Sequence, residues 1–148
     1  MNEPQDGLEL DSRLTELNRV QQWVELLADR LGLIDETRFA IQLCMEEVLA
    51  NIILHGYRNQ AGHPIVIRSY VSRETVLLGI EDKAPPFNPL ESSEYNSAAQ
   101  PASLESMEPG GNGIRLMRRF AGSIEFERLV DGNRLTIGFP MHVRNVPA

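Results

Sequence analysis

The chain has 148 residues, of which 42% are hydrophobic, and a chain of this length can bury a core without disulfides or a structural metal, so we expect one domain over residues 1–148. The formal charge of −7, with 14 basic residues against 21 acidic ones, argues against nucleic acid as a direct partner. No uninterrupted apolar run reaches the about 18 residues of a membrane span, and the acidic, polar N-terminal stretch is unlike a secretory signal, so we expect a cytoplasmic protein without a membrane partner.

Two helices are predicted in the first part of the chain. Apolar residues recur at steps of three and four between residues 12 and 31, with Gly32 as a stop signal; they are Leu14, Leu17, Val20, Val24, Leu27 and Leu31. This stripe either packs on a sheet or forms a homodimer contact. A second helix should begin near Asp35, a good N-cap residue, and end at Gly56. It contains the single cysteine, Cys44, for which we expect a buried structural role.

Two pairs of strands follow, separated by an irregular stretch. Short β-branched segments predict strands at 65–71 and 75–81, with Asp82 at the end of the second. Residues 83–112 are rich in Pro, Ser, Gly and Ala, and a third helix is predicted at 113–120. Strands at 123–129 and 134–139 are joined through residues 131–133. Strands that arrive as hairpins predict an α+β fold with a mainly antiparallel sheet and helices on one face.

The second helix carries a polar face. Glu47, Asn51 and His55 are spaced by four residues and therefore stack along one side of the helix. An isolated pair of Glu and Asn is more often a solvated stripe, and a histidine at a helix end is more often a partner of the helix dipole than a catalytic group. Two further segments favour a functional reading of Glu47 and Asn51.

The first of these segments is Asp82, which ends a strand before a proline-stiffened turn and is well placed to hydrogen-bond the edge of a base. The second is Gly110-Gly111-Asn112-Gly113, where backbone amides before a helix can approach an anion. The glycine loop lacks the Lys-Ser/Thr of a P-loop and does not follow the first strand of a dinucleotide-binding unit, which disfavours both of those folds.

In order, these segments resemble the N, G1 and G2 boxes of the GHKL, or Bergerat-fold, ATPases, and specifically the bacterial anti-sigma-factor serine kinases, over roughly residues 10–140. The most specific motif is Glu-Glu-x-x-x-Asn-x-x-x-His-Gly-Tyr, which begins at Glu46. The resemblance implies a two-layer α/β sandwich of the histidine-kinase-like type, with residues 83–112 forming an ATP lid and the glycine loop.

The resemblance also implies a role for each matching residue. Asn51 would coordinate Mg²⁺, Glu47 would be the general base and Asp82 would receive the adenine amino group. ATP would also be bound by Gly110, Gly111 and Gly113. Thr136 matches a position where relatives often place a hydroxyl near the adenine, and an ordinary strand threonine is the equal alternative. Ala84 departs from the family, which commonly has glycine two positions after the aspartate; if that residue must adopt a positive φ or lie against the base, alanine would weaken adenine binding or shift the loop.

The function implied by the resemblance is an ATP- and Mg²⁺-dependent serine-protein kinase that acts as an anti-sigma factor. It would sequester a sigma factor and phosphorylate an anti-anti-sigma antagonist on serine, and such kinases often form homodimers. A nucleotide-gated regulatory binding protein with little or no kinase activity is the alternative, which the presence of Glu47 disfavours. The catalytic module of a two-component histidine kinase is less favoured, because no histidine precedes the second helix, where a phosphoacceptor helix pair would lie.

Overall fold

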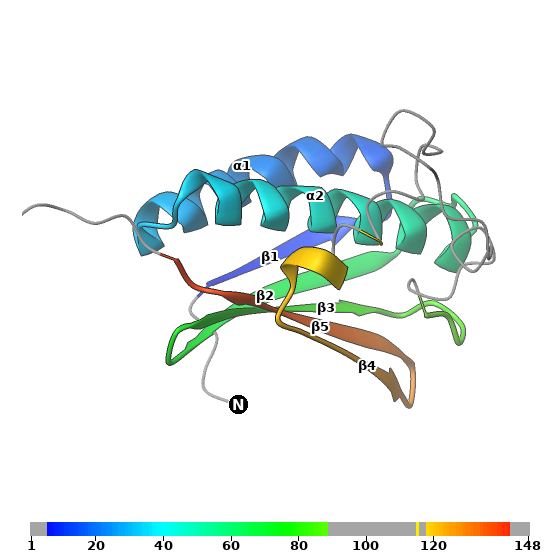
Figure 1. Ribbon diagram of the computed structural model, residues 1–148. Helices are drawn as coiled ribbons and strands as arrows, with labels where there is room; N and C mark the ends of the chain where they lie inside the picture. The colour runs from blue at the N-terminus through cyan, green and yellow to red at the C-terminus, as the bar shows by residue number, and fades with distance from the viewer. Residues whose placement is uncertain (1–5, 89–114, 116–117, 143–148) are drawn as a thin grey trace, which may run out of the picture.

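The computed structural model describes residues 6–88, 115 and 118–142 (Figure 1). Its helical elements are a 3-10 turn (Leu14–Glu16), α1 (Leu17–Leu31), α2 (Asp35–Asn51) and a π-helical turn (Ile52–Gly56) that continues α2. Its strands are β1 (Asp6–Asp11), β2 (Pro64–Ser72), β3 (Thr75–Asp82), β4 (Ser123–Leu129) and β5 (Gly132–Pro140). Residues 115 and 118–120 are also helical, within the range predicted for the third helix.

The described strands form one sheet in the order β1-β2-β3-β5-β4, and each neighbouring pair is antiparallel. Both α1 and α2 lie on the same face of this sheet (Figure 1). The predicted α+β fold, with an antiparallel sheet and helices on one face, is therefore confirmed. Strand β1 was not predicted, although Leu8 and Leu10 alternate there with polar residues and Leu10 is buried opposite Ile65 of β2.

The core lies between the helix layer and the sheet. The apolar stripe of α1 packs into this core through Val20, Trp23, Val24, Leu27 and Ala28. Of the two roles considered for the stripe, packing on the sheet is the one seen here. The stretch Asp35–Gly56 is long and apolar enough, by length and composition, to cross a membrane, and 56% of an apolar 18-residue part of it is buried inside the protein. A core helix packed on a sheet passes the same test, and Ile41, Met45 and Val48 of α2 are fully buried in this core.

The element ends agree with the prediction at α1 and differ from it at α2 and at the loop between β4 and β5. Gly32 ends α1, as predicted, and it does so in a left-handed conformation with φ 68°. Asp35 is the first residue of α2, and Ile34 occupies the N-cap position. The loop between β4 and β5 is Val130–Asp131, and Gly132 and Asn133 already belong to β5, so the turn predicted at 131–133 was placed too late.

Candidate functional site

Helix α2 supplies a carboxylate and an amide from consecutive turns. Asn51, the last residue of α2, is 4% exposed, and Glu47 is half-buried one turn earlier, whereas Glu46 is exposed. Burial, and secondarily the charge of Glu47, raise the pKa of the Cys44 thiol to about 12. Because the thiolate is the reactive form, Cys44 is an inert core thiol, and the polar chemistry on this part of α2 belongs to Glu47 and Asn51.

Asp82 ends β3 as a buried carboxylate, only 4% exposed. Its Oδ1 accepts hydrogen bonds from the backbone N–H of Ala84, at 2.9 Å, and from Nδ2 of Asn133, at 2.8 Å. Burial raises the pKa of Asp82, and these two hydrogen bonds oppose that effect. Among the described residues both bonds fall on Oδ1. The carboxylate is thus held in one orientation through its Oδ1.

Asn133 organises the turn that follows Asp82, although it was not among the site residues expected from the sequence. Its side chain is 1% exposed, and besides Asp82 its Nδ2 reaches the carbonyl oxygens of Ala84, at 3.4 Å, and Pro85, at 3.2 Å. Its Oδ1 accepts a hydrogen bond from the N–H of Phe87 at 3.3 Å. One side-chain amide therefore ties together residues 82–87. The Asp-Gly-Asn stretch is typical of a turn, so no local signal indicated a strand residue opposite Asp82.

Ala84 is compatible with the conformation of this turn. It is 4% exposed, and its φ is not among the positive values in the described chain, which outside glycine occur at Arg58, Asn59 and Arg73. The added methyl group therefore does not strain the backbone. This removes one of the two reasons to expect weaker adenine binding, and the other, a position of this residue against the base, stays a prediction.

The end of α2 packs directly against the same turn. A Cβ built on Gly56 would lie 3.4 Å from the Cβ of Ala84 and 3.2 Å from Cδ1 of Phe87. The ring of His55 lies 6.5 Å from the ring of Phe87, between centroids. The structure thus brings the C-terminal end of the helix that carries Glu47 and Asn51 against the turn that follows Asp82.

Thr136 does not share a face of the sheet with Asp82, so the structure lends no support to its predicted place near the adenine. The register pairs it with Gly79 of β3 and Glu125 of β4. Successive side chains of a strand point to opposite faces, so Thr136 shares the helix-free face with Arg134, which bonds to Glu81 at 2.7 Å. The position opposite Asp82 on the helix-covered face belongs to Asn133.

The glycine loop, Gly110, Gly111 and Gly113, lies outside the described residues, as does 89–112 of the expected lid. Their phosphate-binding role therefore stays a prediction. Arg118 and Arg119, which follow that loop, are exposed, and the guanidinium carbon of Arg119 lies 5.9 Å from the centroid of the Phe120 ring.

The oxygen atom that Asn51 offers suits a hard divalent cation that takes most of its ligands from water and phosphate. Among the described residues, no group of three or more His, Cys, Asp or Glu side chains is arranged to hold a metal. Zinc sites use three or four such ligands. Magnesium takes oxygen ligands and keeps several waters, so the single buried side-chain carbonyl of Asn51 is compatible with magnesium that is also bound by phosphate oxygens.

Known proteins match the chain over most of its length. Residues 10–139 match the family described as the histidine kinase-like ATPase domain. A relative from Bordetella bronchiseptica, serine/threonine-protein kinase BtrW, is 32% identical over 139 residues, which cover 93% of this chain and 94% of the relative.

Two solved structures show the same fold. The histidine kinase domain of the Erythrobacter litoralis EL346 blue-light activated histidine kinase has a TM-score of 0.52 at 20% identity and covers 86% of this chain. This chain spans 60% of that structure. The catalytic domain of the histidine kinase ThkA has a TM-score of 0.51 at 16% identity, with 92% of this chain and 96% of that domain covered. The predicted histidine-kinase-like ATPase fold is confirmed.

Proposed function

The chain belongs to the histidine kinase-like ATPase family, the GHKL ATPases, and we propose that within it the chain is a protein-serine kinase dependent on ATP and Mg²⁺ that acts as an anti-sigma factor. One observation carries the proposal. The chain aligns over 93% of its length with a serine/threonine kinase, and its structure packs the end of the helix that carries Glu47 and Asn51 against the turn after Asp82. The Asp82 carboxylate is buried and held in one orientation.

Asp82 is proposed to select adenine. When ionised, its carboxylate can only accept hydrogen bonds, and its Oδ1 is already occupied by Ala84 and Asn133. Oδ2 is thus suited to an amino group, such as the one on adenine, and unsuited to the carbonyl oxygen that guanine carries at the same position, because two acceptors facing each other would leave both unsatisfied.

Asn51 and Glu47 are proposed to serve the phosphate end of ATP. Asn51 would hold Mg²⁺ through its side-chain oxygen, and bound magnesium supplies neutralisation of charge on the phosphates. Glu47, half-buried one turn before Asn51, would orient a serine hydroxyl of the protein substrate and accept its proton. Gly110, Gly111 and Gly113 would contact the phosphates through their backbone amides.

The partners are proposed from the resemblance of the motifs to anti-sigma-factor kinases. They are a sigma factor, bound and sequestered, and an anti-anti-sigma protein, phosphorylated on serine. We also propose a cytoplasmic location and a homodimer. The net charge of −7 supports protein rather than nucleic acid as the direct partner.

Two measurements test this proposal. Calorimetry should show Mg²⁺-dependent ATP binding by the wild type and weaker binding by Asn51→Ala and Asp82→Ala; unchanged affinity in both variants would overturn the pocket. Incubation with labelled ATP and candidate antagonist proteins should yield phosphoserine. ATP binding without phosphoserine would identify the alternative, a nucleotide-gated binding protein with little or no kinase activity.

A further inference from the structure

Tyr57 joins the end of the α2 helix to the residue that follows Asp82. It comes directly after the π-helical turn Ile52–Gly56 and is 6% exposed. Its hydroxyl oxygen accepts a hydrogen bond from the backbone N–H of Lys83 at 2.6 Å, and the hydroxyl donates to the carbonyl oxygen of Pro64 at 2.7 Å. The hydroxyl therefore accepts one hydrogen bond and donates one, and in this way it links the turn after β3 to the start of strand β2.

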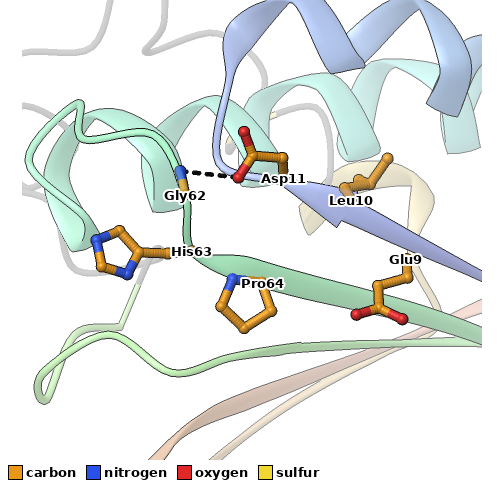
Figure 2. Close-up of a pocket in the computed structure, with 6 residues that line it drawn as sticks. All are labelled: Glu9, Leu10, Asp11, Gly62, His63 and Pro64. Atoms are coloured by element: carbon orange, nitrogen blue, oxygen red, sulfur yellow. Dashed lines mark hydrogen bonds between the residues drawn. The ribbon is translucent and has the colours of Figure 1, made fainter.

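The Tyr57 ring is held from its other side by His63, stacked at 4.8 Å between centroids with an interplanar angle of 11°. His63 is in turn held by the N-terminal strand and the residue after it. The N–H of His63 donates to Oγ of Ser12 at 3.1 Å, and Oδ1 of Asp11 accepts from the N–H of Gly62 at 2.8 Å. Figure 2 shows this last bond between β1 and the loop before β2. The position of the Tyr57 ring is thus set by several fixed neighbours.

The hydroxyl stays protonated in this environment. Burial is the largest cause that raises the pKa of Tyr57, the charge of Asp82 adds to it, and the hydrogen bond from Lys83 opposes it. A protonated phenol can donate and accept at once, which is the pattern observed with Pro64 and Lys83.

We propose that Tyr57 is a positioning residue for adenine recognition, because its hydroxyl fixes the backbone of Lys83 and so the direction in which the neighbouring Asp82 presents its carboxylate. This inference rests on the proposed function, since adenine is the ligand concerned. Asn133 and Ala84 hold Oδ1 of Asp82, and Tyr57 holds the next peptide group along the chain. Selectivity for an amino group over a carbonyl oxygen depends on that direction, because hydrogen bonds weaken steeply as they depart from linearity.

The test removes one oxygen atom at each of two tyrosines. Tyr57→Phe keeps the ring and deletes the acceptor for Lys83. Tyr70→Phe is the matched control, because Tyr70 lies over Gly79, and the β2–β3 register places it on the helix-free face, opposite to Asp82. Affinities for ATP and for inosine triphosphate, which carries a carbonyl oxygen in place of the adenine amino group, are measured by calorimetry on each variant.

We expect Tyr57→Phe to bind ATP about tenfold more weakly than wild type and inosine triphosphate within about threefold, so that the preference for ATP falls. Tyr70→Phe should keep both affinities. A purely structural role would weaken both nucleotides alike, so an unchanged ratio of the two affinities in Tyr57→Phe overturns the inference.

A second measurement on the wild type covers the case in which Tyr57→Phe does not fold. Exchange of the Lys83 amide hydrogen, followed by NMR, should be slow, and ATP should slow it more than inosine triphosphate does. Fast exchange, or equal slowing by the two nucleotides, contradicts the inference. Absence of ATP binding by the wild type would instead defeat the proposed function, so the two failures are distinguishable.

Discussion

The side-chain amide of Asn133 donates a hydrogen bond of 2.8 Å to Oδ1 of Asp82 across the β3–β5 pair. The two residues are direct partners in the register, and both side chains are buried. A buried carboxylate without a donor would favour its protonated form, which could no longer act purely as an acceptor. The bond from Asn133 therefore supports both the charge and the orientation of Asp82.

Substitution of Asn133 should weaken nucleotide binding. Asn133→Ala removes a donor to a buried carboxylate, and hydrogen bonds to charged groups contribute about 1.5–3 kcal/mol, so we expect that loss in the free energy of unfolding and about tenfold weaker ATP binding. Thr136→Ala is the matched control, because Thr136 lies on the opposite face of the same strand. Urea unfolding and calorimetry measure both effects. Equal ATP affinities in the two variants would contradict the assignment of Asn133.

Stability should change with pH through Asp82. Burial, opposed by the bonds from Asn133 and Ala84, raises its pKa above the ordinary value of 3.8. The folded protein therefore holds this proton to higher pH than the unfolded chain, so this group lowers the free energy of unfolding as pH rises from 3.8 through the raised pKa. Above that window the ionised group lowers stability, and below it the group has no such effect.

Asp82→Asn should accordingly be more stable than wild type above this window and similar to it below, because an amide oxygen can still accept from the same donors. ATP binding should be lost. With the amide oxygen in the place of Oδ1, the amide NH2 group would take the place of Oδ2 and face the amino group of adenine, so that two donors would meet and neither would be satisfied. Urea unfolding from about pH 3.5 to about pH 7 gives the comparison. Parallel pH profiles for variant and wild type would show that the carboxyl pKa is not raised.

Gly132 should tolerate no side chain, because it lies against the residues of the site. A Cβ at Gly132 would overlap the carbonyl group of Asp82 and lie 3.1 Å from Cα of Lys83. We expect Gly132→Ala to lose about 2 kcal/mol or more of stability and to weaken ATP binding, because the β4–β5 hairpin must move away from Asp82.

At the control position, Gly122, a Cβ makes an ordinary contact of 3.4 Å with Cδ of Pro140, so Gly122→Ala should change stability by less than about 0.5 kcal/mol. Denaturant midpoints that do not differ would refute this prediction.

Glu47 should affect phosphoryl transfer and not ATP binding. General-base catalysis contributes roughly 100-fold to 10,000-fold, so Glu47→Gln should lower kcat by at least about 100-fold while ATP affinity stays within about twofold. Glu46→Gln makes the same change on the exposed neighbour and should leave kcat unchanged. Single-turnover transfer of labelled phosphate to the antagonist protein provides the measurement. A kcat that falls equally in both variants would remove Glu47 from the role of base.

Much of the fold follows from local patterns. The apolar steps of α1 and the left-handed Gly32 at its end were predictable, because helix periodicity and termination depend on residues within a turn or two of one another. Strand β4 has the predicted ends. Strand β1 was missed because six residues with two leucines give a weak signal, and its pairing with β2 depends on residues more than 50 positions away.

Some features of the candidate site were likewise predictable from local sequence, whereas others depend on tertiary structure. The spacing of Glu47 and Asn51 along α2 is a local property, and it is independent of what packs on the helix. Asn133 and Thr136 are three residues apart on one strand and fall on opposite faces. Which of them meets Asp82 depends on the register with β3, and a shift of one residue reverses every face.

The sequence by itself determined the order of two helices and two hairpins, the family resemblance, and the candidate residues Glu47, Asn51 and Asp82. The tertiary structure decided that Asn133 rather than Thr136 partners Asp82, that Gly132 serves close packing rather than a turn, and that Tyr57 bonds to Lys83. The physical reason is the sequence separation over which each interaction acts. Periodicity and capping act between near neighbours, whereas register, close backbone approach and buried hydrogen bonds join segments 26 to 51 positions apart.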